Sequence, residues 1–252
     1  MRRRALVTGA ARGLAAGIAA ALPADGFDHV VITYRTTPPD ATLAAIESAG
    51  ARAGASRVDF LEDDATVAAA LEGTVRERGP FDTLVHGVGP LAVKRFERLT
   101  LDDYREAFDG NVRSAVLAAR AVLPGMRSAG FGRIVFFAML GSSETRPFRG
   151  FAFYQAAKSA VVAFARCLAL EEARHGITIN VVAPGDIRDK SLTRAQALDR
   201  TAANPRGRPG TRDDVADAVR FLIAPERDFI TGAILDVTGG LSQADERNEP
   251  IQ

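Results

Sequence analysis

Short apolar runs alternate along the chain with longer, alanine-rich segments of helical spacing. The apolar runs predict strands over residues 5–8, 30–34, 53–59, 84–88, 133–140, 177–182 and 233–237. The segments between them predict helices over residues 14–22, 40–49, 65–78, 101–127, 153–174 and 213–223. Strands separated by helices in this way predict an α/β fold, a doubly wound Rossmann fold with a seven-stranded parallel sheet and helices on both faces.

Punctuating residues support the predicted helix ends. Pro23 ends the first helix, Gly50 stops the second, and Thr100 marks the start of the long helix over residues 101–127. Pro124 is expected to distort or end that helix. Residues 186–212 are polar and rich in arginine, proline and glycine, which is typical of a lid or a binding segment inside a domain. We therefore expect one domain, residues 1–252, with 186–212 as its substrate-binding lid.

Composition limits the partners. The 32 basic and 31 acidic side chains give a net charge of +1, which argues against nucleic acid or an anionic membrane surface as a partner. No apolar stretch reaches the roughly 18 residues of a membrane span. Cys167 is the only cysteine, so no internal disulfide forms, and a cytoplasmic location is expected. Three of the basic residues are lysines, Lys94, Lys158 and Lys190, and the other 29 are arginines.

A glycine-containing stretch, Thr8 to Ala15, joins the first predicted strand to the first helix. Gly9 and Gly13 let the backbone approach a phosphate, and the helix start supplies free N–H groups, although an ordinary strand-to-helix turn is the alternative. The second predicted strand ends in Arg35 with no carboxylate before residue 40. A carboxylate there would bind a ribose 2′-hydroxyl, whereas Arg35 and Arg12 suit a 2′-phosphate. The sequence therefore favours NADP over NAD.

Tyr154 and Lys158 are four residues apart near the start of a predicted helix, so their side chains share one face. A free tyrosine has a pKa near 10, and a neighbouring ammonium group is expected to lower the pKa of Tyr154. An exposed polar helix face is the ordinary meaning of such a pair. The scarcity of lysine and the place of this helix after the fifth strand favour a catalytic role instead.

These motifs together resemble those of the classical short-chain dehydrogenase/reductase family over essentially the whole chain. The matching positions are Thr8-Gly9-x-x-x-Gly13, Asp59, Asn111, Tyr154-x-x-x-Lys158, Pro184-Gly185, and Ile230-Thr231-Gly232 leading to Asp236-Val237-Thr238-Gly239-Gly240. Each motif alone is weak, but their shared order and spacing are specific. Within the family, the chain is most similar to the branch that resembles 3-oxoacyl-(acyl-carrier-protein) reductases.

The resemblance implies an NADPH-dependent carbonyl reductase or alcohol dehydrogenase and assigns its residues. Tyr154 would donate the proton, Lys158 would bind the nicotinamide ribose, and Asn111 would hold a water in a proton relay. No metal is implied. The implied cofactor-binding residues, which also include Tyr154 and Lys158, are Gly9, Arg12, Gly13, Leu14, Arg35, Asp59, Phe60, Gly87, Gly89, Pro184, Gly185 and Ile187. The family further implies a homotetramer or homodimer in which the helices bearing Asn111 and Tyr154 form an interface.

Two departures from the family pattern concern structural positions. The third glycine of the phosphate loop is Ala15, a change of one methyl group that we expect to be tolerated. The family's Asn-Asn-Ala-Gly after the fourth strand is replaced by His86-Gly87-Val88-Gly89. Because the first asparagine normally bridges neighbouring strands, His86 is expected to be structural rather than catalytic.

A third departure concerns the family's catalytic serine. Its expected place is occupied by Met139 or Gly141, depending on the direction of counting. Ser142 and Ser143 follow closely, and a shifted loop could present Ser142 to polarise a carbonyl. The alternative is that both serines belong to a surface turn. Losing such a donor would slow the reaction by about 10²–10³ without abolishing it.

Two functions remain open at this stage. The first is a reductase of a small carbonyl compound, including a carrier-linked 3-oxoacyl thioester. The second is a catalytically impaired relative that binds NADP in a structural or sensing role. The sequence does not identify the substrate, although Arg188, Arg194, Arg200 and Arg206 of the lid could attract an anionic carrier or phosphate.

Overall fold

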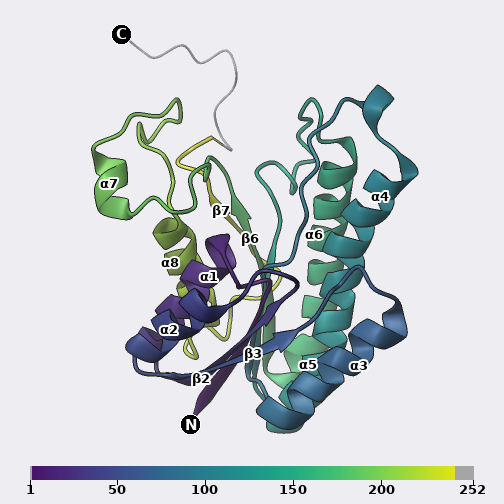
Figure 1. Cartoon of the computed structure of the whole chain (residues 1–252), viewed down its shortest axis with the longest axis vertical. Coiled ribbons are helices and arrows are strands. Elements are labelled where there is room, and N and C mark those ends of the chain that lie inside the picture. Colours follow the sequence, from purple (N-terminus) through teal and green to yellow (C-terminus); the bar gives the residue numbers. More distant parts are fainter. Residues whose placement is uncertain (1, 242–252) are drawn as a thin grey trace.

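The computed structural model describes residues 2–241, and Met1 and residues 242–252 of the predicted domain lie outside this description. Its strands form a seven-stranded parallel sheet in the order β3-β2-β1-β4-β5-β6-β7 (Figure 1). The strands are β1 (Arg3–Thr8), β2 (Phe27–Tyr34), β3 (Arg52–Arg57), β4 (Thr83–His86), β5 (Gly132–Phe137), β6 (Ile177–Pro184) and β7 (Ile234–Val237). The predicted Rossmann fold is confirmed.

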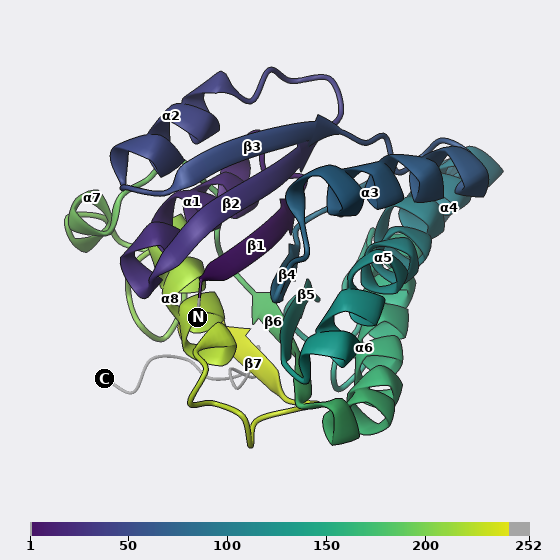
Figure 2. The same ribbon diagram turned by 90° about the horizontal axis from the view of Figure 1, so that it is seen from below.

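Helices cover both faces of the sheet, as the view from below shows (Figure 2). One face carries α1 (Gly13–Ala21), α2 (Asp40–Ser48) and α8 (Arg212–Ile223). The other carries α3 (Asp64–Arg78), α5 (Ser114–Ala129) and α6 (Ala152–Glu172), and α4 (Leu101–Phe108) packs beside α6. The helices of each layer pack against one another as well as against the sheet.

Alternate strand residues face opposite layers, because side chains along a strand point to opposite sides. In β1, Leu6 lies in the core beneath α3, α5 and α6, whereas Ala5 and Val7 lie in the core beneath α1, α2 and α8. All three are completely buried. Burial on both faces explains why the central strands appear in the sequence as continuous apolar runs.

The chain changes direction across the sheet at β1. From β1 it proceeds outward through β2 and β3, then returns to β4 on the other side of β1 and continues to β7. The connections that leave the carboxyl ends of β1 and β4 therefore diverge and open a crevice between them. Ligands of open α/β sheets bind at such a point.

The predicted helix over residues 101–127 is wrong in one respect, the position of its irregularity. The helix changes at a π-helical turn, Asp109–Arg113, between α4 and α5. Pro124 lies inside α5 and does not end it, because the helix continues to Ala129. A π-helical turn shifts the side chains that follow it, and such turns are frequent at functional sites. This one contains Asn111.

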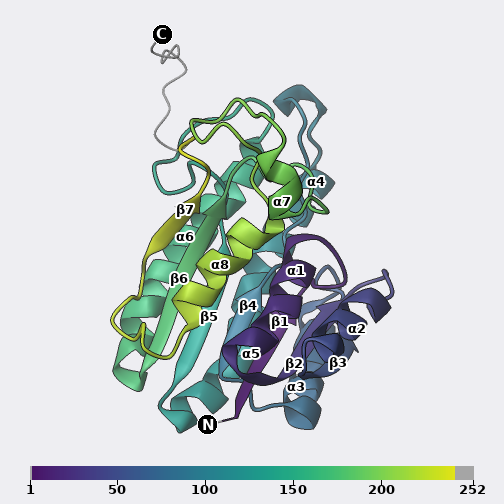
Figure 3. The ribbon, with the colours of Figure 1, turned by 90° about the vertical axis from the view of Figure 1, so that its left-hand side faces the viewer.

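Several predicted strands end earlier than expected. β3, β4 and β5 stop at Arg57, His86 and Phe137, so the remaining apolar residues belong to the connections above the sheet. The predicted lid, residues 186–212, contains a short helix that the sequence did not predict, α7 (Arg194–Leu198). Figure 3 shows this segment above α1 and α8. Within residues 2–241, no helix combines the length and apolarity needed to cross a membrane.

Candidate active site

The connection from β1 to α1 turns on two glycines in the left-handed region. Gly9 has a φ of +65° and Gly13 a φ of +74°, conformations that side-chain-bearing residues rarely adopt. A β-carbon on Gly9 would also lie 3.0 Å from Val88 Cγ2. The Gly9 N–H donates to Thr33 Oγ1 at 3.1 Å, which ties the loop to β2. This connection leads the chain into the amino end of α1, whose dipole favours an anion there.

A pocket of about 270 Å³ lies beside this loop at the carboxyl ends of β1 to β4. It is lined by the glycine loop, by the segments that follow β2, β3 and β4, and by two residues near the π-helical turn. Seven of the cofactor-binding residues implied by the resemblance line it: Gly9, Arg12, Arg35, Asp59, Phe60, Gly87 and Gly89. Both arginines are exposed at its edge. The pocket therefore combines a glycine cradle with two cationic side chains.

Pro184, Gly185 and Ile187 lie at the end of β6 and beyond it. The Gly185 N–H donates to the Val237 carbonyl at 3.0 Å, and a β-carbon on Gly185 would lie 3.3 Å from Leu140 Cβ. Gly185 and Ile187 line a different pocket of about 300 Å³, shared with the lid and β7. The structure therefore does not bring these residues into the pocket that holds Arg12 and Arg35.

Asn111, Tyr154 and Lys158 meet beside Gly89. Lys158 Nζ lies 5.5 Å from the centre of the Tyr154 ring and donates to the Phe137 carbonyl at 2.8 Å. A β-carbon on Gly89 would lie 2.9 Å from Lys158 Nζ and 2.8 Å from Asn111 Oδ1. Only a glycine leaves room between these polar atoms, and Gly89 also lines the pocket.

Asn111 is held rigidly and keeps one acceptor free. Its Nδ2 donates to the Ala107 carbonyl at 2.8 Å and to the Pro90 carbonyl at 3.2 Å. Its Oδ1 is buried and has no hydrogen-bond partner among residues 2–241. Because a buried acceptor without a partner is costly, this oxygen suits a bound water or a ligand hydroxyl.

Burial controls the ionisation of both catalytic candidates. It raises the pKa of Tyr154 to about 12 and lowers the pKa of Lys158 to about 7, because the low-dielectric interior disfavours either charged form. The sequence predicts a lowered pKa for Tyr154, and this is wrong for the structure. At neutral pH Tyr154 is therefore a protonated phenol, and Lys158 gives up its proton more readily than an exposed lysine does.

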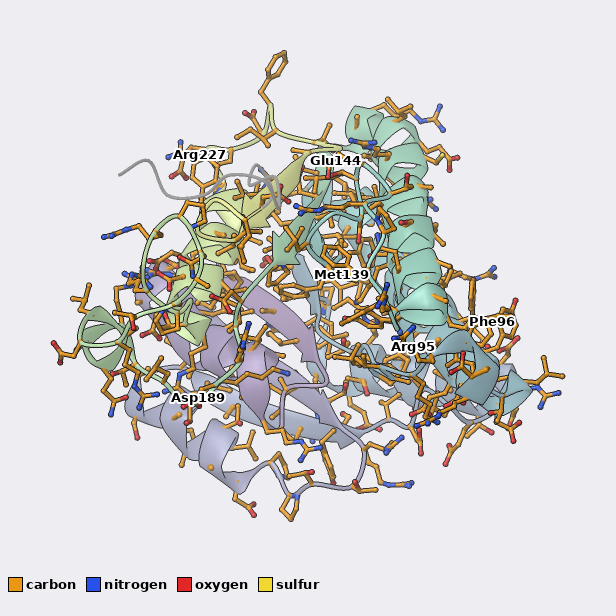
Figure 4. All side chains as sticks on the ribbon, turned by 90° about the horizontal axis from the view of Figure 1, so that it is seen from above. Arg95, Phe96, Met139, Glu144, Asp189 and Arg227 are labelled. Carbon is orange, nitrogen blue, oxygen red and sulfur yellow. The ribbon has the colours of Figure 1, made fainter. Side chains whose placement is uncertain are left out.

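The two candidate serines have different environments. Ser142 is 3% exposed, and its Oγ accepts a hydrogen bond from the Met139 N–H at 3.2 Å. Its hydroxyl therefore lies beside Met139, one of the two residues predicted to occupy the place of the catalytic serine. The Ser143 hydroxyl instead donates to the Glu144 carboxylate. In the view onto the carboxyl edge of the sheet, Met139 lies between Asp189 of the lid and Phe96 on the opposite side (Figure 4).

His86 bridges three elements. Its two hydrogen-bond partners are far from it in the sequence and could not be predicted from it. Thr8 Oγ1 lies 2.8 Å from Nδ1, and Ser114 Oγ lies 3.0 Å from Nε2. Because the Ser114 hydroxyl donates to the Gly110 carbonyl, it accepts from Nε2–H, which leaves Nδ1 to accept from Thr8. Burial lowers the pKa of His86 to about 3, so the ring is neutral. His86 thus connects the glycine loop to the π-helical turn.

Residues 186–212, the predicted lid, are fastened to the body of the protein. Leu192 and Ala197 are buried at 2% and 0% exposure. Arg194 Nη2 lies 2.6 Å from Asp217 Oδ2, and Arg208 forms a two-bond pair with Asp214. Of the four lid arginines considered for an anionic carrier, three face carboxylates: Arg188 faces Asp186, Arg194 faces Asp214 and Asp217, and Arg200 faces Asp189. Their charge is therefore partly neutralised within the chain.

Known proteins are similar to this chain over nearly its whole length. A family model described as enoyl-(acyl carrier protein) reductase matches residues 9–242. The 3-oxoacyl-(acyl-carrier-protein) reductase FabG of Escherichia coli K12 is 34% identical over 242 residues, which cover 94% of this chain and 96% of FabG.

Solved structures show the same relationship. An acetoin dehydrogenase from Enterobacter cloacae superposes with a TM-score of 0.88 at 28% identity, over 99% of both chains. A variant of actinorhodin polyketide ketoreductase, solved with NADPH, has a TM-score of 0.85 at 31% identity, over 96% of this chain and 98% of its own.

Proposed function

The chain belongs to the short-chain dehydrogenase/reductase family, and on that basis we propose that it is an NADPH-dependent reductase of carbonyl compounds. The convergence of Asn111, Tyr154 and Lys158 around Gly89, at the edge of the pocket beside the glycine loop, carries the proposal. A protonated phenol beside a lysine and a free amide oxygen is a proton-donating arrangement. Members of this family are oxidoreductases that act on CH–OH and C=O groups.

The residues present fit a nicotinamide dinucleotide. The glycine loop leaves room for a diphosphate, the pocket has space for an adenosine, and the Asn111 oxygen and the Lys158 ammonium face the same gap at Gly89. The chemistry that NADPH would supply there is a hydride for the carbonyl carbon. Lys158 would hold the nicotinamide ribose hydroxyls, and Asp59 and Phe60 would line the adenine end.

Tyr154 would donate its phenolic proton to the carbonyl oxygen as the alcohol forms. The resulting phenolate is disfavoured by burial, and two groups can stabilise it. The Lys158 ammonium lies close to the ring, and a water held by Asn111 Oδ1 can return a proton. Ser142 would polarise the carbonyl from beside Met139. Pro184, Gly185 and Ile187 would contact the nicotinamide from the β6 end.

The preference for NADP over NAD rests on the segment that follows β2. That end of the pocket presents Arg35 and Arg12. The pocket-lining residues 33–37 include no carboxylate that would repel a 2′-phosphate. Replacing Arg35 with aspartate is expected to weaken NADPH binding by about tenfold or more and to spare NADH. Titration of the intrinsic fluorescence of each dinucleotide with protein measures both affinities.

The relatives suggest the substrate class. The name of the FabG protein specifies 3-oxoacyl groups on acyl carrier protein, and the ketoreductase acts in polyketide chemistry according to its name. We propose a 3-oxoacyl thioester or a related small ketone for this chain. The test is NADPH oxidation at 340 nm with acetoacetyl thioesters, quinones, pterins and keto-sugars. Oxidation with at least one supports the function, and none with any of them contradicts it.

The alternative is a relative that binds NADP without turnover, and Met139 in the place of the catalytic serine favours it. Two variants separate the possibilities. If Ser142 is the working donor, Ser142→Ala lowers kcat by about 10²–10³, and Met139→Ser changes it little. If the site has lost its donor, Ser142→Ala is silent while Met139→Ser raises turnover from background. Melting temperatures of both variants check that each remains folded.

A homotetramer or homodimer is part of the same proposal. The family implies an interface on the helices that carry Asn111 and Tyr154, which here are the π-helical turn with α5, and α6. Small-molecule carbonyl substrates, free or bound to a carrier, are the other expected partners.

A further inference from the structure

Lys190 is a cation on the lid that faces the glycine loop. It lies in the segment that connects β6 to α7, three residues beyond Ile187. A β-carbon built on Gly13 would lie 3.5 Å from Lys190 Cδ, so the lysine stem crosses from the lid to the first residue of α1. The ammonium group is two bonds further along this stem. The stem therefore passes beside the start of α1, where the helix dipole and the glycine loop favour an anion.

The backbone that carries Lys190 is held in place on both sides. Asp189 Oδ1 accepts from the N–H and the hydroxyl of Ser191, at 3.0 and 2.6 Å. Leu192 is buried at 2% exposure, and its N–H donates to the Asp189 carbonyl. The turn around Lys190 is thus anchored against the protein, and the fold determines the position of the Lys190 backbone.

The charge of Lys190 is not neutralised by the protein. The other two lysines are occupied, since Lys94 pairs with Asp103 and Lys158 donates to the Phe137 carbonyl. The neighbouring carboxylate, Asp189, is taken by Ser191 and faces Arg200 at 3.8 Å. Within residues 2–241, Lys190 takes part in no ion pair. Lys190 is therefore an exposed cation whose stem lies beside Gly13 and whose charge no carboxylate of the described residues pairs.

We propose that Lys190 binds the diphosphate of the dinucleotide. This inference rests on the proposed function, because it requires a dinucleotide on the glycine loop. A lysine ammonium is a compact charge with three donors and suits the several oxygens of a diphosphate. Arg12 and Arg35 lie at the adenosine end of the pocket, so the three cations would bind different phosphate groups of the dinucleotide. Lys190 would bind NADP and NAD alike, whereas the arginines would recognise the 2′-phosphate alone.

The test is a crossed binding titration rather than an activity assay. Lys190→Gln is expected to raise the Kd for NADPH and for NADH by the same factor, about tenfold, and to leave the Kd of adenosine 2′-monophosphate unchanged, because that ligand has no diphosphate. Lys190→Arg keeps the charge and is expected to bind within about threefold of the wild type. Arg76→Gln removes one positive charge from a side chain of α3 that is 73% exposed and serves as the charge-matched control, with no change expected.

The outcomes are distinct. An unchanged Kd for both dinucleotides in Lys190→Gln overturns the assignment of Lys190 and leaves the proposed function intact. An equal loss of adenosine 2′-monophosphate affinity also overturns it, since the effect would then be general electrostatics or damage to the fold. If the wild-type protein binds neither dinucleotide, the proposed function fails, and the inference fails with it.

Discussion

At the residue scale, the site combines a tyrosine that resists ionisation with a lysine that loses its proton easily. Burial raises the pKa of Tyr154 to about 12 and lowers that of Lys158 to about 7. A phenol that stays protonated at neutral pH is suited to proton donation, which is the direction of carbonyl reduction. The reverse reaction needs the phenolate, and it should therefore be favoured only at higher pH. The same burial that shifts these pKa values also lowers the stability of the folded protein, because it removes polar groups from water.

His86 offers a test of burial through protein stability. Its pKa is about 3 in the folded protein and near 6.5 when unfolded. Between these values the unfolded chain binds a proton that the folded chain does not. The stability of the wild type therefore falls as the pH drops from 6.5 towards 3, by up to about 1.4 kcal/mol per pH unit.

We predict that His86→Asn removes this pH dependence. The difference in the free energy of unfolding, variant minus wild type, should rise steadily as the pH falls below 6.5, because asparagine does not titrate. Urea denaturation at pH 7.5, 6, 5 and 4 measures it. A difference that is the same at every pH would show that His86 is not a buried neutral ring.

At the scale of the elements, much of the architecture could be predicted because strands and helices have periodic patterns. The glycine pair, Tyr154 and Lys158 could be placed because they fall at fixed points of that alternation. The π-helical turn could not, because Asp109–Arg113 differs from the flanking helices in backbone hydrogen bonding and not in pattern. The approach of the Lys190 stem to Gly13 and the His86–Ser114 bond bring together residues far apart in the chain, so no local pattern predicts them.

Two of the departures from the family pattern, at Ala15 and Gly87, compensate each other in the structure. Ala15 stands where the family has glycine, and Gly87 stands where it has asparagine. A β-carbon on Gly87 would lie 2.6 Å from Ala15 Cβ, which is too close for both positions to carry a side chain. The methyl group of Ala15 is therefore accommodated because the residue opposite it has none.

A double-mutant cycle tests this compensation between α1 and the segment after β4. Gly87→Ala alone should destabilise the protein by about 1–3 kcal/mol through overpacking. In the Ala15→Gly background, Gly87→Ala should be less destabilising, by about 1 kcal/mol or more. Part of the destabilisation should remain, because the Thr8 carbonyl oxygen lies 2.8 Å from the added carbon. Additive free energies of unfolding across the cycle would contradict the compensation.

At the scale of the whole molecule, α6 has an apolar outer face. Ala152, Ala156, Ala163, Cys167 and Leu170 are exposed at helical spacing, and Leu170 is 83% exposed. The opposite face of α6 packs on the sheet and carries Lys158. The helix that carries Tyr154 and Lys158 is thus also the one that presents an exposed apolar stripe, which fits the expected contact between copies.

We predict that the protein is a tetramer or dimer and that Leu170→Glu weakens the assembly. Light scattering should give a molar mass of four or two times 26.7 kDa for the wild type and a shift towards the single-chain mass for the variant. Glu171→Gln, an exposed change on the next residue of the helix, is the control and should leave the mass unaltered. A wild type that remains at the single-chain mass at all concentrations would contradict the proposed assembly.

The most direct test of proton donation by Tyr154 is the turnover of Tyr154→Phe with NADPH and the best substrate of the carbonyl panel. This variant removes the phenolic proton and keeps the ring that lies 5.5 Å from Lys158 Nζ. We predict that kcat falls by about 10²–10⁴ while the Kd for NADPH, measured by fluorescence titration of the same preparation, changes by less than about threefold. Turnover equal to that of the wild type, with NADPH still bound, would contradict the account.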